Sequence, residues 1–277
     1  MLAPIIFFRD FDYQQSKGLF YMIALAYILL FLFIGDRGPA LFLIVILTGL
    51  SYAFLYIRKI PIKYLLVFGI VGIILMHLIG MGRTTDIRDA RENIITRGIE
   101  KTRTTDQSQF YYAITKSMVA NNRNLYVGLE YVDKNGINWG ETYLPSIVGV
   151  IPFAQSIVEY LLEKNFESSA DFFTTLTLGE QRSTGLGTNL VADVYITFGL
   201  IGVIALFLLF GWIVELFRKR TIIINDIYSN IVYFTLLSFS VAYTRIGLFS
   251  PLKFIIWTFV IYYLLKQFNL LKNKPIK

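Results

Sequence analysis

Long apolar segments separated by shorter polar ones are the main pattern of the chain. A helix needs about 20 mostly apolar residues to cross the hydrocarbon layer of a bilayer. Six segments approach this length, although the last has a short apolar centre. They are residues 18–34, 39–57, 64–82, 191–217, 227–244 and 252–268. The pattern predicts an all-α polytopic membrane protein with about six transmembrane helices.

The spacing of the apolar segments divides the chain into three regions. We expect an N-terminal membrane region of three spans at 1–82, a large loop at 83–190 and a C-terminal membrane region of three spans at 191–277. The loop is rich in Tyr, Phe and Asn and has no repeat, which favours folded structure over a linker.

One part of this loop has a helical apolar pattern. Phe153, Ile157, Tyr160 and Leu161 recur at intervals that bring them onto one face of a helix. The pattern predicts a helix after Pro152 that lies on the outer membrane surface or covers the ends of the spans. A re-entrant hairpin is the alternative interpretation.

Composition narrows the class of protein. The chain has 277 residues, of which 55% are hydrophobic and 16% charged, and its mean hydropathy is +0.58. Ordinary soluble domains carry about 25% charged residues, so a single soluble domain and a disordered chain are excluded. The chain has no cysteine and a single histidine, His77, which excludes thiolate sites and metal sites built on several histidines. We expect no metal and no cofactor.

The basic residues predict the topology. Short connections on the cytoplasmic side of a membrane are enriched in Lys and Arg. Twelve such residues fall on the side that holds both termini, and three fall in the opposite short connections. The sequence therefore predicts cytoplasmic termini and an extracytoplasmic loop at 83–190. The net charge of +7 is a signal of topology and indicates no nucleic-acid partner.

Three arginines stand at the predicted outer ends of the spans. Arg37 lies in the turn after the first span, Arg182 in the polar approach to the fourth and Arg245 between the fifth and the sixth. A guanidinium group binds phosphate oxygens bidentately, so a cleft shared by these arginines would suit a lipid-linked diphosphate. Two alternatives remain open: Asp36 and Arg37 could pair to cap two helices, and Arg245 could be an interfacial anchor.

Two carboxylates accompany the arginines. Asp193 lies in the first turn of the fourth span, and Glu180 lies in the approach to it. Either carboxylate could accept a proton from an attacking hydroxyl. The alternative for Asp193 is a structural role as a cap at a helix N-terminus.

Several of these segments carry a family resemblance. Residues 35–39 read GDRGP, and Asp193 is followed by Y-x-x-F-G-x-x-G at 195–202. Pro145 and Pro152 stand in Tyr-Leu-Pro and Ile-Pro elements between them. In order and topology these segments resemble the bacterial oligosaccharide repeat-unit polymerases, the O-antigen polymerase (Wzy-type) family, and in particular the C-terminal portion of its members.

The resemblance implies a metal-independent membrane glycosyltransferase with a GT-C-like fold. Such an enzyme polymerises polyprenyl-diphosphate-linked oligosaccharide repeat units into O-antigen or capsule. It acts at the periplasmic face of the bacterial cytoplasmic membrane, and a chain-length regulator and a flippase are its expected partners. Members usually have ten or more spans, so we expect either an N-terminally truncated form or a reduced protein that needs a partner. The family acid before the Tyr is often Glu, whereas this chain has Asp193.

Three other functions stay open from the sequence. A ligase-like transferase would share the lipid-linked donor but move finished polymer to lipid A core. A transporter for the same lipid-linked sugars should have charged or Gly/Pro-broken spans near the bilayer midplane, whereas the polar groups here cluster at the span ends. A structural membrane subunit is the third alternative.

Overall fold

The structure is a computed structural model that describes residues 17–34, 37–54, 96, 99–100, 122–179, 185–224 and 226–268, with the backbone alone at 17–19, 33, 37 and 51–54. Within these residues the regular structure is helical and no strand occurs. The helices before residue 118 and those after residue 119 belong to two compact units.

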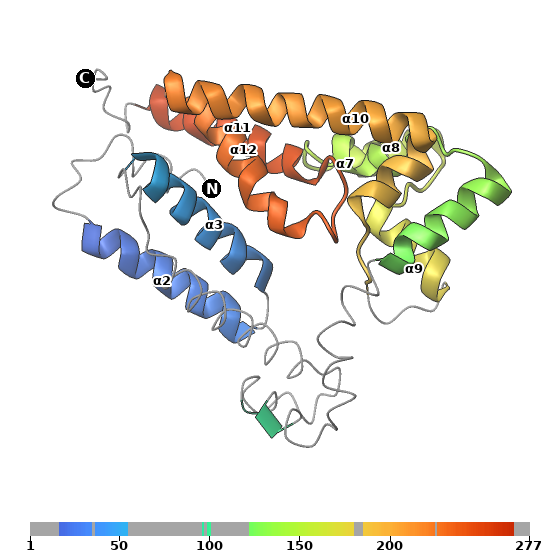
Figure 1. Cartoon of the computed structure of the whole chain (residues 1–277), viewed down its shortest axis with the longest axis horizontal. Helices are drawn as coiled ribbons and strands as arrows, with labels where there is room; N and C mark the ends of the chain where they lie inside the picture. Colours follow the sequence, from blue (N-terminus) through green and yellow to red (C-terminus); the bar gives the residue numbers. More distant parts are fainter. Residues whose placement is uncertain are drawn as a thin grey trace. The chain divides into compact units, whose positions relative to one another are not determined.

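The first unit contains the helical hairpin of α2 (Lys17–Ile34) and α3 (Arg37–Phe54), which pack along each other (Figure 1). Ala24 of α2 and Ala40, Ile46 and Leu50 of α3 are buried. Other large apolar side chains of α2 point outward and stay exposed. The first two predicted spans are therefore helical. The third, at 64–82, lies outside the described residues.

The second unit contains the three C-terminal helices. α10 (Leu190–Ile223) packs against α11 (Ile227–Phe239), which continues into the short helix η3 (Ser240–Ala242) and packs against α12 (Ser250–Gln267) (Figure 1). These helices match the last three predicted apolar segments. Among the described helices, α10 alone is long and apolar enough to cross a membrane by length and composition. The total number of spans stays a prediction.

The predicted loop contributes helices to the same unit. They are residues 122–135, η2 (Glu141–Tyr143), α7 (Leu144–Val148), α8 (Ala154–Leu162) and α9 (Ser169–Leu178). The prediction of a helix after Pro152 is confirmed by α8. A small core of Phe173, Ala192 and Ile196 joins α9 to the first turns of α10. The loop helices thus pack on the part of α10 that carries Asp193.

Gly199 divides α10 into two parts. Its backbone angles of φ 66° and ψ −166° are non-helical and lie in a region that L-residues avoid. The break leaves the carbonyl of Ile196 without its normal helical donor, and the N–H of Asn138 bonds to it at 3.0 Å. The break thus separates the short segment that carries Asp193 from the apolar segment after residue 199.

Gly202, the second glycine of the Y-x-x-F-G-x-x-G motif, is also required by the break at Gly199. A Cβ atom on Gly202 would collide with the Cβ of Phe198, on the other side of the kink at Gly199. Any larger residue at 202 would force the turn open. The backbone therefore explains the F-G-x-x-G spacing. Gly199 adopts the non-helical angles of the kink, and Gly202 avoids a collision with Phe198.

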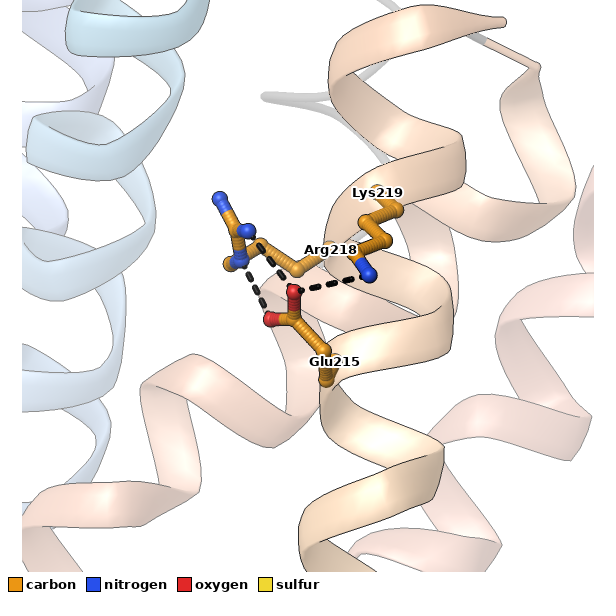
Figure 2. Close-up of polar contacts among 3 residues, drawn as sticks. All are labelled: Glu215, Arg218 and Lys219. Carbon is orange, nitrogen blue, oxygen red and sulfur yellow. Dashed lines mark hydrogen bonds and ion pairs between the residues drawn. The ribbon is translucent and has the colours of Figure 1, made fainter.

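The opposite end of α10 is basic. The guanidinium of Arg218 donates to both carboxylate oxygens of Glu215 at 2.6 and 2.8 Å, and Lys219 lies 3.7 Å from the same carboxylate (Figure 2). The side chains of Glu215 and Arg218 are more than 40% exposed. This end of α10 is a solvated cluster in which the carboxylate is paired with cations.

Candidate functional site

The candidate site is the junction where the approach to α10 runs beside the loop that follows η3. The N–H of Thr188 donates to the carbonyl of Arg245 at 3.0 Å, and the N–H of Leu190 donates to the carbonyl of Tyr243 at 3.1 Å. Two segments more than 50 residues apart in sequence are thus held together by backbone hydrogen bonds. Because these bonds satisfy polar groups near apolar helices, they are costly to break.

Gly187 makes this close approach possible. It has φ +76°, and a Cβ atom added to it would lie 2.6 Å from the carbonyl oxygen of Arg245. Both the positive φ and the lack of space require glycine. Gly185, two residues earlier, has nothing within 4 Å of such a Cβ, so the requirement is specific to Gly187.

Side chains from the loop helices support the approach segment. The amide of Asn124, which is fully buried, donates from Nδ2 to the carbonyl of Gly187 at 3.1 Å. The hydroxyl of Ser169 donates to that of Thr188 at 3.0 Å. Residues 122–135 and α9 therefore hold the segment from the side opposite the Arg245 loop.

The N-terminus of α10 is capped by Asn189. Its side-chain oxygen accepts the N–H groups of Val191 and Ala192 at 2.9 and 3.3 Å. The sequence interpretation that Asp193 caps this helix is therefore wrong, because Asn189 fills the cap position four residues earlier. Asp193 lies in the first turn and is free to point its carboxylate elsewhere.

The carboxylate of Asp193 is fully buried and bonds to the Arg245 loop. Its Oδ2 accepts the N–H of Leu248 at 3.0 Å, and Gly247 lies so close that a Cβ on it would be 2.8 Å from the same oxygen. Its other oxygen, Oδ1, is buried and has no hydrogen-bond partner among the described residues. One oxygen is thus anchored to backbone, while the other accepts no hydrogen bond of good geometry although hydroxyl groups lie near the carboxylate.

Tyr143 closes the site from the loop side. The hydroxyls of Tyr143 and Ser169 lie near the Asp193 carboxylate, and the ring of Tyr143 packs edge-on against Phe249 with centroids 4.9 Å apart. Burial, together with the charge of Asp193, raises the pKa of the Tyr143 phenol. Tyr143 therefore keeps its proton and can act only as a neutral hydrogen-bond partner at ordinary pH.

The structure brings two of the five predicted site residues together. Asp193 bonds to the loop that carries Arg245, and the Arg245 side chain is exposed beside Gly187. Arg37 is the first residue of α3, in the other compact unit, and its side chain is outside the described part. Arg182 and Glu180 also lie outside the described residues. A shared cleft for the three arginines therefore stays a prediction.

Sequence reasoning missed the residues that build the junction. Asn124 and Ser169 gave no signal, because single polar residues in a loop are common. Gly187 and Tyr143 were detectable in part: Gly187 stands in a Gly-x-Gly element, and Tyr143 begins the Tyr-Leu-Pro element that carried part of the resemblance. Within the part of the chain that the structure describes, no three His, Cys, Asp or Glu side chains gather as a metal site would require.

Comparison with known proteins decides the family. The chain matches the family described as O-antigen polysaccharide polymerase Wzy over residues 5–272. It belongs to that family. The protein is thus an integral membrane enzyme that polymerises O-antigen repeat units and acts on lipid-linked oligosaccharides in the membrane.

The family match confirms the resemblance drawn from residues 35–39 and 195–202. No curated protein and no solved structure matches the chain. The GT-C-like fold therefore stays a prediction.

Proposed function

We propose that this Wzy-family polymerase joins repeat units at the periplasmic face, by a metal-independent transfer that takes place at the Asp193 junction. The observation that carries the proposal is the Asp193 carboxylate. It is buried, its Oδ2 is held by the N–H of Leu248, its Oδ1 accepts no hydrogen bond from the described residues, and the loop that holds it also carries the exposed Arg245. A buried carboxylate with one oxygen that accepts no hydrogen bond suits a proton acceptor, and an arginine carried by the same loop suits the binding of an anionic leaving group.

In the proposed reaction a hydroxyl of one repeat unit attacks the anomeric carbon of another. The new glycosidic C–O bond forms while the C–O bond to the diphosphate breaks, and polyprenyl diphosphate leaves with the bonding electron pair. The hydroxyl proton passes to Oδ1 of Asp193, or to Glu180 if that residue is the base. Arg245, with Arg37 and Arg182, stabilises the negative charge that builds on the diphosphate.

The two ends of α10 support a periplasmic site. The basic cluster of Arg218, Lys219 and Arg220 belongs on the cytoplasmic side by the distribution of Lys and Arg. Asp193, in the first turn of α10 at its other end, then faces the periplasm. Both termini are then in the cytoplasm of a bacterial cell, and the helices of residues 122–178 are on the periplasmic side of its cytoplasmic membrane.

Partners follow from the chemistry of the substrate. A periplasmic polymerase needs its lipid-linked repeat units carried across the membrane, which implies a flippase. It also needs a limit to chain growth, which implies a chain-length regulator. Both are part of this proposal.

Two experiments test the proposed function. Reporter fusions after Gly136, which is exposed between the loop helices, and after Lys277 should read out on opposite sides of the membrane. Readout on the same side would contradict the topology.

Purified protein given a polyprenyl-diphosphate-linked repeat unit should form a ladder of polymers and release polyprenyl diphosphate in EDTA as well as in Mg²⁺. Loss of the ladder in EDTA with recovery on adding Mg²⁺ would contradict metal independence.

A further inference from the structure

Helix α8 is inverted in polarity compared with a helix on the surface of a water-soluble protein. Its large apolar side chains, and that of Phe153 just before it, point away from the protein. Their exposed fractions are 82% for Phe153, 57% for Ile157, 83% for Tyr160, 70% for Leu161 and 60% for Leu162. A contiguous exposed apolar surface of this kind marks a contact with something that is not water.

The polar side of α8 faces the protein. The carboxylate of Glu159 is partly buried, and it accepts the side-chain N–H of Gln155 at 2.9 Å and the backbone N–H of Phe166 at 3.3 Å. A helix packed on a soluble protein turns its apolar side to the core and its charged side to water. Here the arrangement is reversed, so the outer environment of α8 must be the apolar one.

The ends of α8 hold this orientation. Phe153 and Glu163, which flank the helix, have φ values of 65° and 50°, in the left-handed region that non-glycine residues rarely adopt. Such strain persists only where surrounding contacts maintain it. The helix is thus set at a defined angle between two sharp turns.

The turn before α8 is tied to a helix of the membrane region. The indole N–H of Trp257 in α12 donates to the carbonyl of Val150 at 2.9 Å. Trp257 is in the N-terminal half of α12, whereas the last turn of that helix carries Lys266. The hydrogen bond therefore ties the turn before α8 to the half of α12 that lies away from the basic last turn.

We propose that α8 is an interfacial helix that lies in the bilayer surface on the Asp193 side, with Phe153, Ile157, Tyr160, Leu161 and Leu162 toward the acyl chains. The family acts in the membrane, and the aromatic rings on this face suit the headgroup boundary. The chain continues from Tyr143, beside Asp193, directly into α7 and α8. The lipid surface thereby positions the segment that closes the site at the depth of the lipid diphosphate.

The natural absence of cysteine allows a direct test. Single variants Ile157→Cys and Leu161→Cys, and the control Asp133→Cys on the exposed part of residues 122–135, are spin-labelled in the full-length protein in lipid nanodiscs. Labels at 157 and 161 should be several-fold more accessible to oxygen than to the water-soluble nickel complex Ni-EDDA. The label at 133 should show the opposite preference.

Two results would overturn the proposal. Nickel access at 157 and 161 equal to that at 133 would mean that this face is in water. Low access to both reagents would mean that a protein surface, either a second copy or a partner, covers it. An environment-sensitive fluorophore on the same cysteines, quenched by lipids that carry a nitroxide at the headgroup level, checks the result independently. The accessibility readout needs no catalysis, so its failure is distinguishable from failure of the proposed reaction.

Discussion

The two ends of α10 each carry a carboxylate, and their surroundings are opposite. Glu215 is more than 40% exposed and is paired with Arg218 and Lys219 (Figure 2). Asp193 is fully buried, its Oδ2 accepts the backbone N–H of Leu248, and the hydroxyls of Tyr143 and Ser169 lie near its carboxylate. A carboxylate that is already neutralised by cations in water has little left to do chemically, whereas a buried one with a free oxygen is costly to maintain. The free-energy cost of burying the Asp193 carboxylate indicates that this group has a function.

The largest difference in polymerisation between the two ends of α10 should appear when each carboxylate is replaced by its amide. Asp193→Asn keeps an oxygen that can accept the Leu248 N–H but cannot take a proton. We expect it to reduce polymerisation about 100-fold or more, the usual range for loss of a general base. The measurement is polymer length on gels from cells that lack their own polymerase and carry each variant in the full-length protein. Full-length polymer from Asp193→Asn would leave Asp193 with a structural role only and would favour Glu180 as the base.

The next largest effect is expected at Arg245. Arg245→Lys keeps the charge but loses the fork that binds two phosphate oxygens. It should reduce polymerisation nearly as much as Arg245→Ala, while the amount of protein in the membrane fraction stays unchanged because the side chain is exposed. Normal polymer from Arg245→Lys would reduce Arg245 to a point charge or an interfacial anchor.

A substitution at the backbone junction between the approach to α10 and the Arg245 loop should have an intermediate effect on polymerisation. Gly187→Ala places a methyl group against the Arg245 carbonyl at a positive φ, which costs about 1–2 kcal/mol for the conformation alone. We expect shorter polymers and a lower thermal midpoint for the purified protein. Gly185→Ala is the matched control, because it meets nothing within 4 Å. Equal behaviour of the two variants would show that the junction does not support the site.

The smallest effect should follow Glu215→Gln. This change removes the ion pairs with Arg218 and Lys219, but exposed pairs contribute about 1 kcal/mol or less. Polymer length and membrane level should match the unmodified protein. A loss comparable to that of Asp193→Asn would mean that the two carboxylates are not distinguished by burial, and the comparison would fail.

The positions of the described helices were predictable from the sequence. Helices occupy most of the predicted segments at 18–34, 191–217, 227–244 and 252–268 and the described residues of the segment at 39–57, because a bilayer demands long apolar runs whose backbone groups bond within the helix. The amphipathic pattern around Ile157 likewise predicted α8 from local spacing. The family was also predictable, because the GDRGP and F-G-x-x-G motifs are short stretches of contiguous sequence.

The environment of Asp193 could not be read from the sequence. Its first-turn position suggested a cap, but Asn189 fills that place and Asp193 bonds 55 residues away, to Leu248. Which of two nearby polar residues caps a helix depends on the path of the chain before the helix, and that path is decided here by Gly187 and its contact with Arg245.

The sequence by itself therefore determined the helical class, the order of the helices, the family and the residue types available for chemistry, because each depends on patterns within a few turns of chain. Tertiary structure alone decided that Asp193 is buried with one oxygen anchored, that Asn124 and the Arg245 loop hold the segment of Gly187 and Thr188 between them, and that α8 turns its apolar side outward. These features arise where segments distant in sequence meet. Burial and hydrogen bonding there depend on which surfaces come into contact, and hydrophobic spacing along one segment carries no information about its neighbour.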